Sequence, residues 1–161
     1  MSLRLRLALA GAMAILVALV ITAIGLSQLF GAHVERRAVA ELGVQLDQVL
    51  AGLDVGADGL TLQRPLADPR FATPYGGLYW QIEWGGGIER SRSLWDTALA
   101  LPADTLGDGG VHVHHLAGPQ GDALLVLERS VMLPARLGGG SARAAVGMAA
   151  AELVQAQRDF M

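Results

Sequence analysis

The stretch that decides the fold is Leu78-Tyr-Trp-Gln-Ile-Glu-Trp84, followed by Gly85-Gly-Gly87. Its apolar and polar side chains alternate, with the two-residue period of a half-buried β-strand. The three glycines supply a hairpin turn, so residues 88–94 are predicted to return as a second, more polar strand. The stretch therefore predicts an antiparallel sheet.

More turns and apolar runs extend this sheet along the chain. The turn sequences Gly118-Pro-Gln-Gly-Asp122 and Gly138-Gly-Gly140 each separate two strand-like segments. Residues 124–127 are apolar on both faces, which is typical of the sheet interior. Residues 149–160 are expected to start a helix. The additional strands expected are residues 60–62, 111–116, 123–133 and 142–148.

On the N-terminal side, residues 7–26 contain one polar side chain, Thr22, and no charge. Twenty helical residues span roughly 30 Å, the thickness of a bilayer's hydrocarbon core. A cleaved signal peptide is the competing interpretation, because Arg4 and Arg6 would suit its charged start. Its apolar run is usually shorter, about 7–15 residues, so an uncleaved anchor is favoured. The long segment that follows is expected outside the cytoplasm.

Residues 33–53 are predicted to continue as a helix, ended by turn residues at 54–59. Apolar residues recur along it at spacings of three and four, which is a heptad pattern. The pattern leaves two arrangements open: a helix packed on its own domain, or a parallel dimer that transmits movement through the membrane. One helix could do both, and this apolar stripe is predicted to be the dimer and signalling helix of the intact receptor, through Val39, Leu42, Leu46, Val49 and Leu53.

Composition excludes several classes of function. The 161 residues include no Cys, Lys or Asn, which excludes disulfides, thiol nucleophiles and lysine Schiff bases. Residues 1–32 carry a net charge of +2 and residues 33–161 a net charge of −5, which together give −3. An acidic main portion argues against nucleic-acid binding.

Candidate chemistry is sparse. His112 and His114 lie on one face of a predicted strand, with Asp108 or Asp122 as a possible third ligand, but a solvated face is preferred to metal binding or proton sensing. Residues 54–59 resemble a calcium or glycine-rich nucleotide loop only superficially, and a helix-ending turn is preferred. No serine nucleophile motif occurs, so no catalytic or cofactor-binding residue is predicted.

Six of the eight aromatic residues fall between positions 71 and 95, and this segment is expected to anchor the core. Tyr79 is the aromatic residue on the polar face of its strand. It is either an exposed binding contact or packed under the long helix, and the second is preferred. The predicted sensor-core residues are Phe71, Tyr75, Tyr79, Trp80, Trp84 and Trp95.

These residues suggest a family. His33-Val-Glu-Arg-Arg37 with Glu41-Leu42 resembles the opening of bacterial two-component sensor histidine kinases. Asp68-Pro-Arg-Phe71 and the aromatic run at 74–82 resemble the periplasmic sensing domain of one such group. The resemblance continues through residues 90–96 and the pair Glu128-Arg129.

The resemblance implies an α+β fold: a transmembrane helix continuing into a long helix, then a PAS-like mixed domain with an antiparallel sheet and a C-terminal helix. It divides the chain into a cytoplasmic tail (1–6), a transmembrane helix (7–29), a periplasmic sensor domain (30–148) and the start of a helix leading to a second membrane helix (149–161). The expected location is the bacterial inner membrane.

In such kinases a phosphoacceptor His and an ATP-binding domain follow. No His here precedes an acidic residue in the manner of that motif, and the ATP-site Asn is absent, so we expect a fragment that is inactive alone. The resemblance implies a homodimer, a response regulator as partner, and ATP and Mg²⁺ only in the missing kinase core. The alternative is a stand-alone anchored or secreted periplasmic binding protein. The sequence does not identify the stimulus.

Overall fold

A computed structural model describes residues 3–103 and 109–151 of the chain. Helix α1 runs from Leu3 to Ala51. The residues up to Arg37 form one compact unit, and the residues from Ala38 onward form a second. The domain boundaries expected from the sequence remain predictions.

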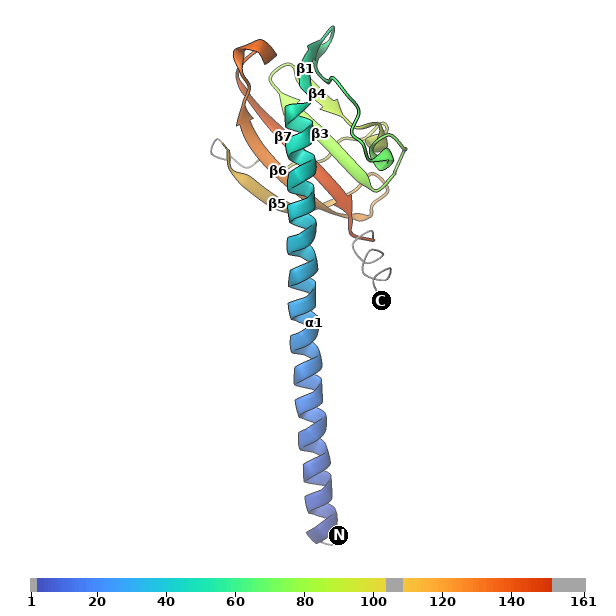
Figure 1. Cartoon of the computed structure of the whole chain (residues 1–161). Helices are drawn as coiled ribbons and strands as arrows, with labels where there is room; N and C mark the ends of the chain where they lie inside the picture. Colours follow the sequence, from blue (N-terminus) through green and yellow to red (C-terminus); the bar gives the residue numbers. More distant parts are fainter. Residues whose placement is uncertain (1–2, 104–108, 152–161) are drawn as a thin grey trace. The chain divides into compact units, whose positions relative to one another are not determined.

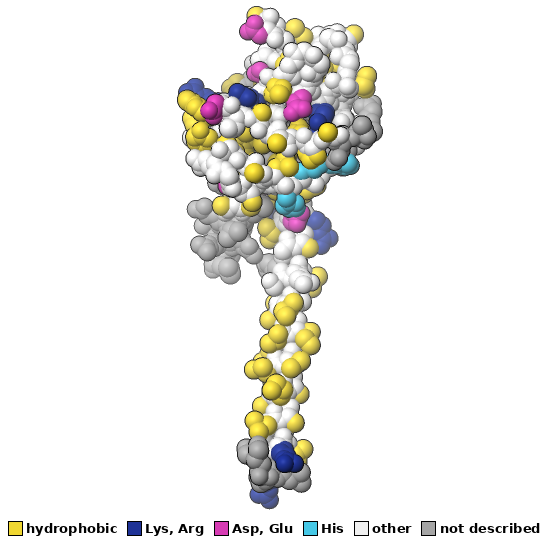
Figure 2. Space-filling view, turned by 180° about the vertical axis from the view of Figure 1, so that it is seen from behind, with side chains coloured by type: hydrophobic (Ala, Val, Ile, Leu, Met, Phe, Trp, Pro, Cys, Tyr) yellow, Lys and Arg dark blue, Asp and Glu magenta, His cyan; other side chains and the backbone are white. Residues whose placement is uncertain are grey.

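The first unit is the N-terminal part of α1. An 18-residue window of this helix has a mean hydropathy of 2.7, and none of that window is buried. Hydrophobic side chains follow one another along its visible face (Figure 2). The Thr22 hydroxyl donates a hydrogen bond to the Ala18 carbonyl at 2.8 Å, so its polar group is satisfied within the helix. The helix is long and apolar enough to span a membrane.

The second unit is built on a five-stranded antiparallel sheet in the order β4-β3-β7-β6-β5 (Figure 1). The last strand along the chain, β7, lies between β3 and β6 and pairs with both. The strand predicted at residues 78–84 is confirmed, and the helix-plus-sheet arrangement agrees with the α+β class. The strands are β3 (Leu78–Trp84), β4 (Gly87–Arg90), β5 (Val111–Ala117), β6 (Ala123–Met132) and β7 (Ser141–Ala149).

A separate two-stranded hairpin follows α1. It consists of β1 (Leu53–Gly56) and β2 (Gly59–Leu62). The predicted helix end at residue 53 was therefore wrong: α1 ends at Ala51, and Leu53 belongs to a strand, although it is still buried. The turn expected across 54–59 is reduced to two residues, because Leu53 and Asp54 pair with Leu62 and Thr61.

Three short 3₁₀ helices complete the unit: η1 (Pro69–Phe71), η2 (Arg92–Leu94) and η3 (Ala135–Leu137). The strand predicted at 88–94 is correct only to Arg90, after which the chain turns into η2. The helix predicted from residue 149 was wrong at its start, since Ala149 ends β7. Residues 150 and 151 are helical, and the rest of that prediction lies outside the described residues.

Both faces of the sheet are covered. The C-terminal part of α1 crosses one face, where Leu42 and Leu46 pack in a cluster with Trp80 and Ile82 (Figure 1). On the other face a second cluster contains Tyr79, Leu94, Leu99, Leu124, Val126, Ala145 and Ala149. The prediction that residues 78–84 form a half-buried strand was wrong, because the chain around Leu94–Leu99 covers what would have been its solvent face.

Candidate functional site

The second face of the sheet holds a group of polar and charged side chains, named here the Glu128 cluster: Gln81, Glu83, His114, Glu128 and Arg143. Glu128 is fully buried at its centre. Its Oε2 lies 2.9 Å from His114 Nε2, and its Oε1 accepts a hydrogen bond of 2.5 Å from Arg143 Nε. Both carboxylate oxygens therefore have a partner, as a buried charge requires.

Strand register explains how residues distant in sequence meet in this cluster. Glu83 on β3 lies directly opposite Arg143 on β7, and their charged groups are 3.7 Å apart. Ala145 on β7 lies opposite both Gln81 and Glu128. Because alanine is small, the polar side chains on both sides of it reach over the central strand.

The cluster also forms hydrogen bonds to the segment that covers this face. Gln81 Nε2 donates hydrogen bonds to Glu83 Oε1 at 2.7 Å and to the Leu99 carbonyl at 3.1 Å, and Gln81 Oε1 accepts from the Leu99 N–H at 2.7 Å. Arg143 donates to the Pro102 carbonyl. The buried Gln81 amide thus gives the Leu99 N–H an acceptor, and it shares the Leu99 carbonyl with the Leu101 N–H, which donates to that carbonyl at 3.0 Å.

The chemistry available to the Glu128 cluster is electrostatic. It combines two carboxylates, one guanidinium and one imidazole, and no nucleophilic side chain. Its side chains come from β3, β5, β6 and β7, so it links four strands of the sheet.

The two histidines singled out from the sequence have different environments. His114 is engaged with Glu128, whereas His112 is exposed and its ring meets that of His114 edge-on at 5.9 Å. Asp122 lies in the turn at the far end of β5, and Asp108 is outside the described residues. Within residues 3–103 and 109–151, no group of three or more His, Cys, Asp or Glu could hold a metal ion.

The predicted aromatic core is correct in part. Phe71 and Trp80 are buried in the cluster under α1, and Trp84 is partly buried against it. Tyr79 is buried, but on the opposite face of the sheet, so the expectation that it packs under the long helix was wrong. Alternation along β3 dictates this, since neighbouring residues of a strand point to opposite faces.

Tyr75 and Trp95 are not core residues: their exposed fractions are 40% and 54%. Both have a positive φ of 56°, and Trp95 combines it with ψ −112°, a conformation that normally requires glycine. The two loops are joined, because the Tyr75 N–H donates a hydrogen bond of 2.9 Å to the Ser93 carbonyl. Exposed aromatics in strained conformations are typical of binding surfaces.

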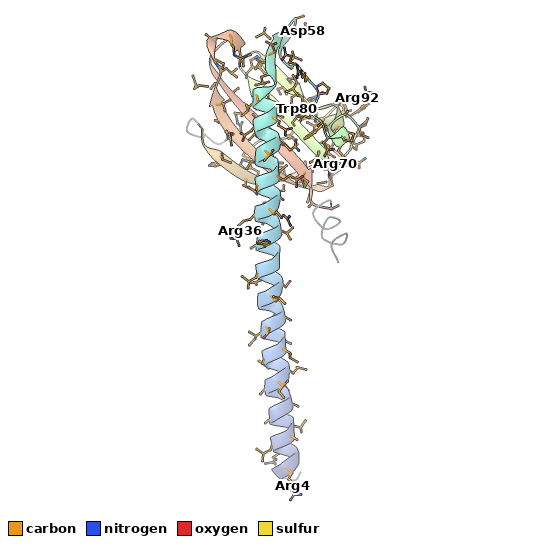
Figure 3. All side chains as sticks on the ribbon, viewed as in Figure 1. Arg4, Arg36, Asp58, Arg70, Trp80 and Arg92 are labelled. Atoms are coloured by element: carbon orange, nitrogen blue, oxygen red, sulfur yellow. The ribbon has the colours of Figure 1, made fainter. Side chains whose placement is uncertain are left out.

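Polar contacts hold these loops to β3. Ser93 Oγ donates a hydrogen bond of 2.6 Å to the Leu78 carbonyl, and Ser91 Oγ accepts one of 3.0 Å from the Trp80 N–H. In η1, Arg70 forms an ion pair of 2.7 Å with Asp68, which lowers the pKa of that carboxyl. Figure 3 shows Arg70 and Arg92 in neighbouring loops beside β3.

The apolar stripe is occupied within the domain. Leu42, Leu46 and Val49 are fully buried against the sheet, while Leu53 lies in β1 and Val39 is partly buried beside the same cluster. Of the two arrangements left open by the sequence, the structure has the helix packed on its own domain. Arg129 on β6 adds an ion pair of 2.6 Å to Asp47 on α1. A homodimer stays a prediction, and its contact would need other residues than these.

Sequence reasoning did not identify the Glu128 cluster as a unit. The available signal was a charged residue, Glu128, directly after four apolar residues in an interior strand. Charged groups are almost never buried without a partner, so this position predicts a buried cation nearby. Which cation it would be depends on strand order, and the sequence alone does not give that order.

Comparison with known proteins supports a sensor-kinase-related region in this chain. One relative is the Sensor protein kinase CarS of Pseudomonas aeruginosa, with 34% identity over 91 residues. The match covers 56% of this chain and 20% of the relative, so the chain spans about a fifth of that protein. No family model matches the chain. No solved structure matches it.

Proposed function

We propose that this chain is the signal-input region of a membrane-bound two-component sensor histidine kinase. The observation that carries the proposal is the 34% identity to a sensor protein kinase over more than half of the chain. The apolar helix supports it, because a receptor that senses on one side of a membrane and acts on the other needs a spanning segment.

The proposed mechanism uses α1 as the transmitting element. A stimulus acts by binding one packing of the sensor domain better than another. Leu42, Leu46 and Val49 connect α1 to the sheet, and the same helix contains the apolar segment. A change in the sheet packing would therefore change the relative free energies of the positions that α1 can take. That change would in turn alter the activity of the kinase.

The proposed setting is the bacterial inner membrane, with Arg4 and Arg6 in the cytoplasm and the sheet domain in the periplasm. The partners are the lipid bilayer, a second copy of the receptor and a cytoplasmic response regulator. ATP and Mg²⁺ would bind to the kinase core, outside residues 1–161. The core would autophosphorylate on His and pass the phosphate to the regulator.

The test uses native membranes and an antibody against the sheet domain. The proposal expects a membrane-bound species far larger than 16.8 kDa that acquires acid-labile phosphate from labelled ATP. The 161-residue chain alone is the matched control and should acquire none. A native species of 16.8 kDa without ATP-dependent labelling would contradict the proposal and favour a stand-alone binding protein.

Orientation has its own experiment. Alkaline phosphatase fused after residue 151 should be active, because that enzyme folds only outside the cytoplasm, and the same fusion without residues 7–26 should be inactive. An active cytoplasmic reporter at the same position would reverse the proposed orientation.

A further inference from the structure

Beyond the end of α1 the sheet domain contains a groove with a volume of about 730 Å³. Three segments form it: the β1–β2 hairpin, the β3–β4 turn, and the chain from η3 to the start of β7. Its volume lies within the range of small-molecule sites. The lining residues central to its chemistry are Leu60, Trp84, Arg136, Leu137 and Ser141.

Glycine keeps this groove open. Six of its 13 lining residues are glycine. A Cβ added at Gly85 or at any of residues 138–140 would meet no atom within 4 Å, so those positions face open space. Gly59 has a different role, because a Cβ there would approach the Trp84 ring to 2.9 Å. The groove thus has an indole held in place and no side chain filling the space beside it.

The charge of the lining is one-sided. Arg136 is its one charged residue, is exposed, and forms no ion pair with any residue that the structure describes. Leu60 and Leu137 are buried and provide an apolar floor together with Trp84. An unpaired guanidinium beside an apolar, aromatic surface suits a ligand that is flat and apolar at one end and anionic at the other.

We propose that this groove binds a small aromatic carboxylate, with the carboxylate on Arg136 and the ring against Trp84. Ser141 and the main chain of the glycine turns supply further polar groups at the rim. The site is at the opposite end of β3 from Tyr75, so it is distinct from the exposed aromatic loops. The proposal does not depend on the kinase assignment, because binding is measured on this chain alone.

The experiment uses the full chain in lipid nanodiscs and ligand-observed NMR. Benzoate and 2-naphthoate are the probes, their uncharged amides are shape-matched controls, and empty nanodiscs correct for partition into lipid. The expected result is saturable binding of at least one carboxylate, and at least about tenfold weaker binding of its amide.

Four variants locate the site. Arg136→Gln should weaken carboxylate binding at least about tenfold, and Arg136→Lys should retain part of it. Gly85→Leu should abolish binding by filling the groove, since Gly85 has open space and no positive φ. Arg64→Gln, an exposed arginine outside the groove, should bind as the parent chain does. Melting curves show whether each variant is folded.

Four outcomes overturn the proposal. The first is equal binding of acids and amides, and the second is binding that Arg136→Gln and Gly85→Leu leave unchanged. The third is no saturable binding of either acid below about 10 mM. If Gly85→Leu instead changes the number of chains per complex, the groove is covered by a second copy of the chain and the ligand proposal is wrong.

Discussion

Replacing Leu46 by Ala tests how α1 is held in the sheet domain. Leu46 is fully buried among core residues that include Leu42 and Val49. A buried Leu→Ala change costs about 2–5 kcal/mol, and the complete burial of Leu46 places the expectation near about 3 kcal/mol. At about 3–6 °C per kcal/mol for a domain of this size, the melting temperature should fall by about 10–20 °C.

The assay is thermal unfolding followed by near-ultraviolet circular dichroism, on nanodiscs that each contain one chain. The matched control is Val44→Ala on the same helix, because Val44 is 57% exposed and should change stability by about 0.5 kcal/mol or less. Since one chain per disc excludes a dimer, the full loss must come from packing within the chain. If Leu46→Ala has no effect in these discs, but does when two chains share a disc, the reasoning is refuted.

Three further predictions use the same melting assay. Glu128→Ala should lower the free energy of unfolding by about 3 kcal/mol, because it leaves Arg143 without its buried partner. The double variant Glu128→Ala with Arg143→Ala should lose less stability than the sum of the two single variants. Strict additivity would show that the two side chains are not coupled. Trp95→Gly should be more stable than Trp95→Ala by about 1 kcal/mol, because glycine relieves the positive φ; the usual order, with alanine more stable, would show no strain there. Asp68 has a lowered pKa in the folded state, so its contribution to folding stability is present above the unfolded pKa of 3.8 and is lost as the pH falls through and below that value. Asp68→Asn should therefore lower stability less at pH 3 than at pH 7. An equal loss at both pH values would contradict the Arg70 interaction.

The strands could be predicted because their signals are local. The sequence alternation along residues 78–84 and the glycines after them depend only on neighbouring residues, and the strand and the turn that they predict are both observed. Strand order is not local: nothing in residues 141–149 specifies that this strand pairs with β3 on one side and β6 on the other. The Glu128 cluster depends on that strand order. Its residues could therefore be noted individually from the sequence, but their proximity in the fold could not be predicted.

The error at the end of α1 has a local physical origin. The spacing of Leu53 fits the apolar stripe, so the sequence predicts a helix to that residue. The residue after Ala51 is Gly52, however, and its N–H donates hydrogen bonds to the Gln48 and Val49 carbonyls as the helix ends.

The exposure of Tyr75 and Trp95 was missed for another reason. Aromatic residues are usually buried, and the exposure of these two is seen only in the folded structure, where both also have a positive φ.

The central place of β7 determines when the domain can fold during biosynthesis. Ribosomes make β3, β4, β5 and β6 before β7, and β3 and β6 each have an unpaired edge until residues 141–149 have been made. The two hairpins contact each other mainly through that strand, so neither can complete the core early. Unpaired apolar edges of this kind invite pairing with other chains. A cell that makes this protein must therefore keep the nascent chain from aggregating until residues 141–149 have joined the sheet.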